Sequence, residues 1–377
     1  MSSVLYLLQG CSGKIEKLNE EISLLKKNYM HDSRTDICTV EVKKGNGDTI
    51  TLKGETTIPG LKTALLKYLG EKQISLTDSI LILPDTITNH RFFGIAALSV
   101  INLRKEPDHS SELVSQAVMG TPVMILKTVD SWIQVRTPDR YISWTERSSI
   151  RSVNRDEMKE WKNSDRVVFT DNTGWIYSNI AETGVVGDLV AGSILARRGE
   201  SGPYARVVLP DGREGFVLNS SFVSFDQFRH KDTVLAEDII NRASSLTGVP
   251  YLWGGSAAKG IDCSGFVQTV FFMNGLIMAR DASQQALYGD SLDISHDFSN
   301  LRAGDLLFFG SPRRITHVAI YKGDGDYIHS SGRVMVNSLD STRSNYSSYR
   351  RNSLVKAMRV LNSPDPGIVP VDKHPWY

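Results

Sequence analysis

The sequence predicts a multidomain α+β protein with a small N-terminal α+β unit, two small β-barrels and a C-terminal α+β domain. The chain has 377 residues, more than one ordinary domain holds. Apolar residues at helical spacing occur near both ends, whereas short alternating strands with Gly, Pro and Asp turns fill the middle. A glycine-rich loop then runs into an apolar helix that begins at Cys263.

The N-terminal part predicts a helix followed by a small α+β unit, divided as residues 1–30 and 31–95. Apolar residues lie three or four apart from Ser12 to about Asn28. Residues 39–52 then predict a β-hairpin that turns at the sequence GNGD. A short amphipathic helix and one more strand follow, and no motif carries chemistry. We expect this unit to be a spacer or a packing platform.

Two all-β stretches, residues 96–152 and 166–228, look like a diverged internal repeat. The segment GTPVMIL of the first aligns with AGSIL of the second, and WIQV aligns with YARV. Short strands separated by tight turns suit small barrels. Residues 153–165 predict a helical connector between them.

The C-terminal domain is expected over residues 229–363, with a tail over 364–377. Its first helix is predicted from Lys231 to about Thr247. The helix after Cys263 is apolar until it ends near Asn274 and Gly275, so we expect it to be buried and to hold its first residue rigidly.

Charge and cysteine content exclude several classes of protein. The 43 basic and 42 acidic residues leave a formal charge of +1, which argues against an electrostatic nucleic-acid binder. No uninterrupted apolar stretch is long enough to span a bilayer. The three cysteines, Cys11, Cys38 and Cys263, do not make a disulfide framework.

The N-terminus resembles the end of a lipoprotein signal, because an apolar run leads to small residues and an acylatable Cys11. No Lys or Arg precedes the run, which is also short for such a signal. We expect a lipid anchor on Cys11 and a location in the cell envelope, facing the periplasm or the exterior. The alternative is a plain N-terminal helix with a buried Cys11 and a cytoplasmic location.

Cys263 is the candidate nucleophile. The thiolate is the reactive form, and a helix N-terminus favours the anion. Two strand-like segments downstream supply His317 and His329, and a Cys followed by two strand-borne His residues indicates a cysteine hydrolase. The competing interpretation is an inert buried thiol, against which the polar neighbours Asp262 and Ser264 argue.

The spacing of the two histidines raises a difficulty. A symmetric two-residue turn at Asp324 and Gly325 would leave His329 about three residues out of register with His317. They can meet only if the turn or a β-bulge shifts the pairing.

Four separated motifs resemble the NlpC/P60 family of peptidoglycan hydrolases. They are YLWGG at residues 251–255, DCSGF at 262–266, RAGDLLFF at 302–309 and HVAIY at 317–321. From about Leu98 onward the chain resembles the γ-D-glutamyl-L-diamino-acid endopeptidases, which precede a papain-like catalytic domain with two bacterial SH3-like modules.

The resemblance implies roles for individual residues. Cys263 would be the nucleophile, His317 the general base and His329 the residue that orients it. Asp262 would pair with the ammonium group of a substrate with a free N-terminal L-alanine, and Tyr141 would line the pocket that holds it. The other implied pocket residues are Tyr251, Ser264, Ser283 and, more weakly, Glu112.

The implied function is a thiol peptidase of the dipeptidyl-peptidase VI type, with a murein stem peptide as partner and no cofactor or metal. It would hydrolyse the γ-D-glutamyl–diamino-acid bond and release L-Ala-γ-D-Glu during peptidoglycan turnover or recycling. One alternative is a lipid-anchored protein that binds wall fragments and has an inactive catalytic domain. Others are a transamidase or acyltransferase with the same Cys-His-His set, and a zinc site made of Cys263, His317 and His329.

Overall fold

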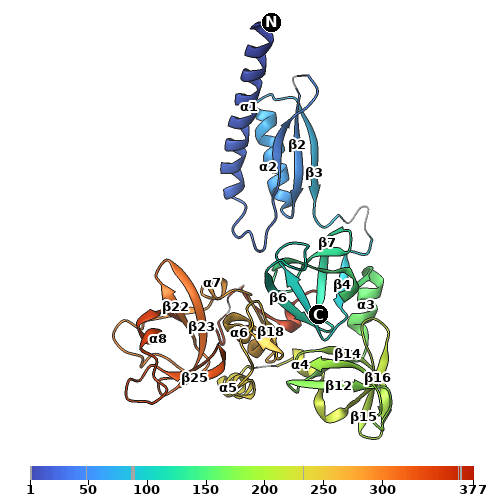
Figure 1. The fold of residues 1–377 in the computed structure, drawn as a ribbon, viewed down its shortest axis with the longest axis vertical. Helices are drawn as coiled ribbons and strands as arrows, with labels where there is room; N and C mark the ends of the chain where they lie inside the picture. The colour runs from blue at the N-terminus through green and yellow to red at the C-terminus, as the bar shows by residue number, and fades with distance from the viewer. Residues whose placement is uncertain (1, 48, 86–89, 232, 364, 366) are drawn as a thin grey trace. The chain divides into compact units, whose positions relative to one another are not determined.

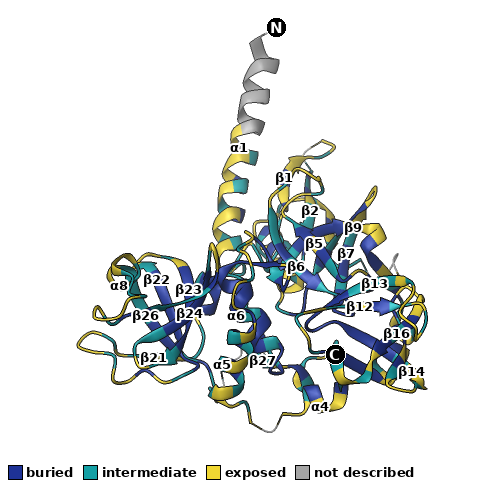
Figure 2. Ribbon diagram, turned by 60° about the horizontal axis from the view of Figure 1, so that its bottom comes forward, coloured by how far each residue is buried: buried dark blue, intermediate teal, exposed yellow. Residues whose placement is uncertain are grey.

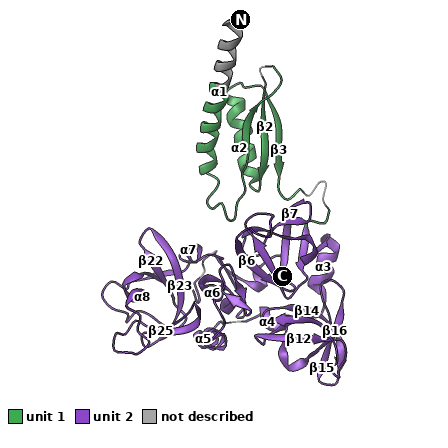
Figure 3. Cartoon of the chain, viewed as in Figure 1, with its two compact units in different colours: residues 1–92 green, residues 93–377 purple. Residues whose placement is uncertain are grey.

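The computed structural model describes residues 2–47, 49–85, 90–231, 233–363, 365 and 367–377, without the side chains of residues 2–12 and 14. The chain divides into two compact units, residues 1–92 and 93–377 (Figure 3). Each is described by itself.

The first unit is a three-stranded sheet whose core is shared with two helices. Its elements are α1 (Ser2–Lys27), β1 (Glu41–Lys44), β2 (Ile50–Thr56), α2 (Pro59–Glu71) and β3 (Leu76–Ile82). β2 pairs with β1 antiparallel and with β3 parallel, so α2 is the crossover between parallel strands. Leu61, Leu65 and Leu69 are fully buried at the four-residue spacing that the sequence predicted for this helix. The predicted hairpin is confirmed, and α1 runs through Cys11.

The second unit begins with two antiparallel sheets. The first module contains β4 (Phe93–Ala96), β5 (Val100–Arg104), β6 (Leu113–Val118), β7 (Pro122–Val129), β8 (Trp132–Arg136), β9 (Ile142–Glu146) and β10 (Ile150–Val153). It starts three residues earlier than the sequence analysis placed it, because β4 pairs with both β7 and β10. Helix α3 (Arg155–Asn163) follows as the predicted connector.

The second module contains β11 (Arg166–Phe169), β12 (Thr173–Tyr177), β13 (Val185–Val190), β14 (Ile194–Ser201), β15 (Tyr204–Val208), β16 (Glu214–Leu218) and β17 (Phe222–Ser224). Counted within each module, both sheets have the strand order 7-1-4-5-6-2-3. The internal repeat is therefore confirmed in topology. Among the described residues the end strands of neither sheet pair with each other, so closed barrels are not confirmed.

The C-terminal domain packs one buried helix against a six-stranded antiparallel sheet (Figure 1). The sheet order is β21 (Asp290–Leu292), β26 (Leu354–Arg359), β22 (Leu306–Ser311), β23 (Arg314–Gly323), β24 (Asp326–Ser331) and β25 (Arg333–Ser338). The helices are α4 (Phe225–Arg229), α5 (Ala236–Ser245), α6 (Cys263–Phe272), α7 (Ala282–Gln285) and α8 (Ser348–Ser353). The short strands β18 (Ser256–Ala257) and β19 (Gly260–Ile261) form the loop before α6.

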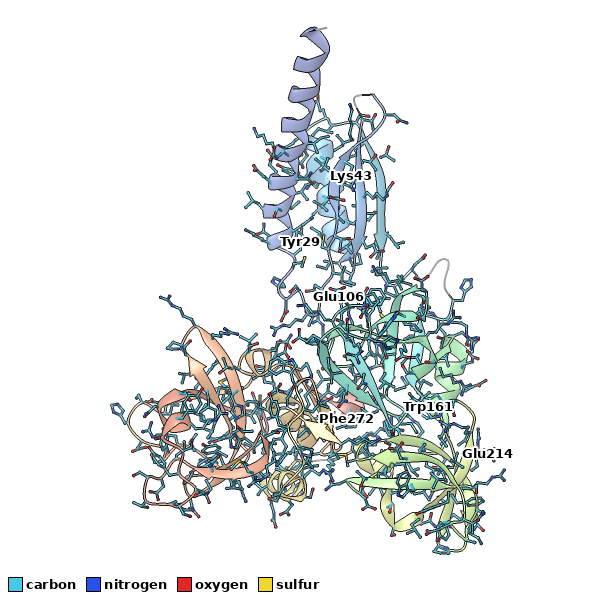
Figure 4. The ribbon with its side chains drawn as sticks, in the orientation of Figure 1. Tyr29, Lys43, Glu106, Trp161, Glu214 and Phe272 are labelled. Atoms are coloured by element: carbon cyan, nitrogen blue, oxygen red, sulfur yellow. The ribbon has the colours of Figure 1, made fainter. Side chains whose placement is uncertain are left out.

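Helix α6 is dark blue over most of its length in Figure 2 because eight of its ten residues are buried. The sequence predicted this burial from the run of apolar residues. Residues predicted as a tail contain β27 (Ile368–Pro370), which pairs with β20 (Leu276–Met278). One hydrophobic cluster, which includes Trp161 and contacts Phe272, joins the tail to α3, α4 and both modules (Figure 4).

Candidate active site

Cys263 is the first residue of α6, and the loop before it holds that position rigidly. The Asp262 side chain caps the helix by accepting a 2.7 Å hydrogen bond from the Gly265 N–H. Gly265 packs directly on the loop, since a Cβ there would lie 2.1 Å from the Gly255 carbonyl oxygen. The Cys263 residue is 8% exposed. The backbone N–H of Val318 donates to its sulfur, so the thiol faces β23 beside His317.

The two histidines meet on neighbouring strands. His317 Nε2 lies 2.7 Å from His329 Nδ1, and the two rings are nearly perpendicular. On β23 and β24, Tyr321 pairs with Tyr327, but Gly323 pairs with Asp326. Lys322 is therefore an extra residue on β23, a β-bulge next to the turn.

This bulge resolves the register difficulty. In a regular hairpin Lys322 would pair with Tyr327. His317 and His329 would then be an odd number of positions out of register and would lie on opposite faces of the sheet. With the one-residue shift, they become diagonal neighbours on one face, within reach of aromatic rings. The sequence-based expectation that a bulge would be needed is confirmed.

A further residue, Asn337 on β25, sets the direction of this hydrogen-bond chain. Its Nδ2 donates over 2.8 Å to the Asn345 carbonyl, which can only accept, so its Oδ1 faces His329 Nε2 at 2.8 Å. His329 therefore carries its proton on Nε2 and accepts at Nδ1 from His317 Nε2–H. His317 Nδ1 is left with a lone pair. The sequence analysis missed Asn337, because only the β24–β25 register places it diagonal to His329.

Burial favours the neutral forms of the thiol and both imidazoles. It raises the pKa of the Cys263 thiol to about 11, and the negative charge of Asp262 adds to this effect. Burial first, then the charge of Arg350 and that of His329, lower the pKa of His317 well below 6.5. Burial also lowers the pKa of His329 to about 4. The backbone N–H groups of Val318 and Ser264 lower the pKa of the thiol, and the expectation that the helix N-terminus favours a thiolate stays a prediction.

Asp262, expected to contact a substrate ammonium, already has a cationic partner. Its Oδ2 lies 2.6 Å from Arg280 Nη2 in an almost fully buried ion pair, and it accepts from the Gly254 N–H at 3.0 Å. Arg280 also donates to Ser264 Oγ at 2.9 Å and to Ser115 Oγ of the first module at 3.1 Å. A substrate ammonium would thus share Asp262 with Arg280. The sequence analysis did not identify Arg280.

The first module contacts the loops on this side of Cys263. Tyr141 is buried and its hydroxyl donates to Asp281 Oδ2 over 3.5 Å. Glu112 Oε1 accepts from Trp253 Nε1 at 2.9 Å. Gly254 has a φ of +77°, and a Cβ there would lie 2.2 Å from the Leu113 carbonyl oxygen. The first module therefore packs directly on the YLWGG loop.

The remaining predicted pocket residues lie around the same centre. Tyr251 is half-buried, and burial first, then its interactions with Cys263 and Asp262, raise its pKa to about 12. Ser264 is buried beside Asp262 and donates to Asp262 Oδ1 at 3.2 Å. Ser283 is half-buried in α7, the helix that Asp281 caps.

Two other predictions concern metals and membranes. Among the described residues, no group of three or more His, Cys, Asp or Glu could hold a metal ion, which leaves the zinc alternative without a site there. In that part of the chain no helix has both the length and the apolar content to cross a bilayer. The Cys11 side chain lies outside the described residues, so the lipid anchor stays a prediction.

Comparisons with known proteins match this architecture. The family model "NlpC/P60 family" matches residues 248–359, and "Bacterial dipeptidyl-peptidase Sh3 domain" matches residues 103–150. The dipeptidyl-peptidase 6 of Lysinibacillus sphaericus is 30% identical over 72% of this chain and 98% of its own. The γ-D-glutamyl-L-lysine dipeptidyl-peptidase of Bacillus cereus is 28% identical over 59% of this chain and 68% of its own.

Solved structures agree at the level of the fold. A crystal structure of an NlpC/P60 family protein from Bacillus cereus has a TM-score of 0.63 at 23% identity, covering 71% of this chain and 99% of that chain. The sequence relatives, the two family matches and the Cys263–His317–His329 site together lead to one conclusion. The chain belongs to the NlpC/P60 family of peptidoglycan peptidases and carries a bacterial SH3 domain before its peptidase domain.

Proposed function

We propose that the protein hydrolyses the γ-D-glutamyl–diamino-acid bond of murein stem peptides that have a free N-terminal L-alanine, and releases L-Ala-γ-D-Glu. The observation that carries the proposal is the directed chain from Asn337 through His329 to His317, beside a thiol fixed at the start of α6. Relatives named as γ-D-glutamyl-L-lysine dipeptidyl-peptidases support the choice of bond.

The chemistry begins from two neutral groups. As the Cys263 sulfur attacks the γ-carbonyl carbon of D-glutamate, His317 Nδ1 takes the thiol proton. His329 accepts a hydrogen bond from His317 Nε2–H and so stabilises the imidazolium that forms. Backbone N–H groups in the first turn of α6 are the donors for the oxyanion.

The second half of the reaction returns the enzyme to its starting state. His317 gives its proton to the departing amine of the diamino acid, which leaves a thioester on Cys263. Water then attacks the thioester carbonyl while His317 takes a proton from it, and the proton returns to the sulfur as L-Ala-γ-D-Glu leaves.

The first module accounts for the proposed restriction to short substrates. It contacts the loops beside Cys263, where Glu112 accepts from Trp253 and Tyr141 donates to Asp281. An enclosed ammonium group needs an anionic partner, and Asp262 and Glu112 are the carboxylates that we propose for this role. A glycan chain attached to the alanine would have to displace these contacts, so free stem peptides are the expected substrates.

Product analysis tests the reaction. The protein is incubated with L-Ala-γ-D-Glu-L-Lys and with L-Ala-γ-D-Glu-meso-diaminopimelate, and mass spectrometry identifies the products, with Cys263→Ala as the blank. We expect L-Ala-γ-D-Glu and the free diamino acid from at least one peptide with the wild type alone. A folded wild type that cleaves neither peptide would favour the binding-protein alternative.

A further inference from the structure

Arg350 is a cation that the Phe309 ring connects to His317, and among the described residues it has no anionic partner. It lies half-buried on α8, and its Nη2 donates to Ser331 Oγ at 3.2 Å. Its guanidinium lies 5.7 Å from the centre of the Phe309 ring. Within the described ranges of the chain, no carboxylate lies at ion-pair distance from Arg350, whereas the buried Arg280 is paired with Asp262.

Several observations connect Arg350 to the catalytic centre. The Phe309 ring that it faces lies 5.7 Å from the His317 ring. The positive charge of Arg350 helps to lower the pKa of His317 and of His329, and it also acts on Tyr251. The positive charge of this half-buried guanidinium disfavours the protonated form of His317 and so opposes general-base catalysis. A bound anion would offset that charge.

The fold indicates which end of the substrate lies there. The first module, with Tyr141 and Glu112, contacts the side of Cys263 where the alanyl end is expected. In Figures 1 and 2, α8 lies at the end of the C-terminal domain away from strand β6 of that module, with α6 between them. A stem peptide that enters with its alanine under the module would extend its leaving residue towards α8.

The leaving residue carries the matching charge. His317 must reach its amine to protonate it, and the Cα carboxylate is two bonds from that amine. Meso-diaminopimelate carries a second carboxylate on its side chain, and lysine does not. Resting on the proposed function, we propose that Arg350 binds a carboxylate of the leaving diamino acid. If the bound group is the Cα carboxylate, Arg350 selects stem peptides that end at the diamino acid.

Three substrates separate the two carboxylates. They are L-Ala-γ-D-Glu-L-Lys, the same peptide with its Cα carboxylate amidated, and the meso-diaminopimelate peptide amidated at that Cα carboxylate only. Wild type, Arg350→Gln and Arg350→Lys are compared by kcat/KM. Arg351→Gln, an exposed neighbour whose guanidinium lies over the Phe298 ring, is the matched control.

With the wild type, we expect a free carboxylate to raise kcat/KM by roughly 10- to 100-fold over the lysine amide, as for a charge-assisted hydrogen bond. If the lysine peptide with a free Cα carboxylate is cleaved faster than its amide, Arg350 binds the Cα carboxylate. If the diaminopimelate amide is cleaved faster than the lysine amide, Arg350 binds the side-chain carboxylate. Arg350→Gln should lose the preference, Arg350→Lys should keep part of it, and Arg351→Gln should keep all of it.

The outcome that overturns the inference does not depend on any variant folding. If the wild type cleaves all three peptides with equal kcat/KM, Arg350 binds no leaving-group carboxylate, although the proposed reaction stands. The inference also fails if the wild type shows the preference and a folded Arg350→Gln keeps it. If the wild type cleaves none of the peptides, it is the proposed function that is wrong.

Discussion

At the scale of single residues, Asn337 decides which nitrogen of His317 can act as the base. Asn337→Ala removes the acceptor from His329 Nε2, so either tautomer of the pair becomes available. We expect kcat to fall roughly 10- to 100-fold with little change in KM, as for outer partners that orient catalytic histidines. Asn300→Ala, at an exposed amide that donates to the Asp293 carbonyl, is the control.

The pH profile separates an orienting role from a structural one. Asn337→Asp keeps an acceptor towards His329 and adds a negative charge, which favours the protonated imidazoles. His317 must be neutral to accept the thiol proton, so the acidic limb of kcat/KM should move to higher pH in this variant. If the acidic limb of kcat/KM stays at the same pH in Asn337→Asp, the orienting role is contradicted.

Cys263 should react with alkylating agents as a buried neutral thiol. Because burial raises its pKa to about 11, its thiolate fraction grows with pH throughout the neutral and mildly alkaline range. The rate of carbamidomethylation by iodoacetamide, followed by mass spectrometry of the peptide that contains Cys263, should therefore still be rising at pH 10. A plateau reached below pH 8 would show a preformed thiolate instead.

At the scale of secondary-structure elements, the bulge at Lys322 is what brings the two imidazoles to one face. Deleting Lys322 removes the extra residue but leaves Tyr321 opposite Tyr327 and Gly323 opposite Asp326, so His317 and His329 should stay on one face. We therefore expect the deletion variant and Lys322→Ala both to retain most of their activity. A folded deletion variant whose activity falls by roughly a thousand-fold or more, as for the loss of a triad member, would show that the bulge is needed for more than the register.

The sequence predicted the elements better than their connections. Cys263 at the start of a buried helix, the hairpin of the first unit and the connector α3 follow from local periodicity and turn residues. The Asp262–Arg280 ion pair joins residues 18 positions apart, and its partner has no local signal. Asn337 was missed for a related reason, since a one-residue bulge and a strand register determine its place. The raised pKa of the Cys263 thiol is a consequence of burial, which no sequence motif reports.

At the scale of the whole second unit, the C-terminal residues join the peptidase domain to both modules. The Tyr377 ring is 6.0 Å from Phe272 of α6 and 6.2 Å from Phe225 of α4, and its cluster includes Ile95 and Ile194 from the two modules. Residues predicted only as a tail are therefore part of the core that joins the first module to the peptidase domain.

Tyr377→Ala should weaken this core. Removing a buried aromatic ring costs about 3 kcal/mol of unfolding free energy. Urea unfolding followed by tryptophan fluorescence should show this loss, whereas Lys373→Ala, at a side chain that is 75% exposed, should change stability by less than about 0.5 kcal/mol. Equal stability of the two variants would show that the tail does not brace the unit.

The most direct test of the central claim compares one stem peptide with a free N-terminal L-alanine and the same peptide acetylated there. The account combines thiol catalysis by Cys263 and His317 with a cleft that the first module closes around an ammonium group. It predicts release of L-Ala-γ-D-Glu from the free peptide and no cleavage of the acetylated one, with Cys263→Ala inactive on both. Equal cleavage of the two peptides would contradict the closed cleft.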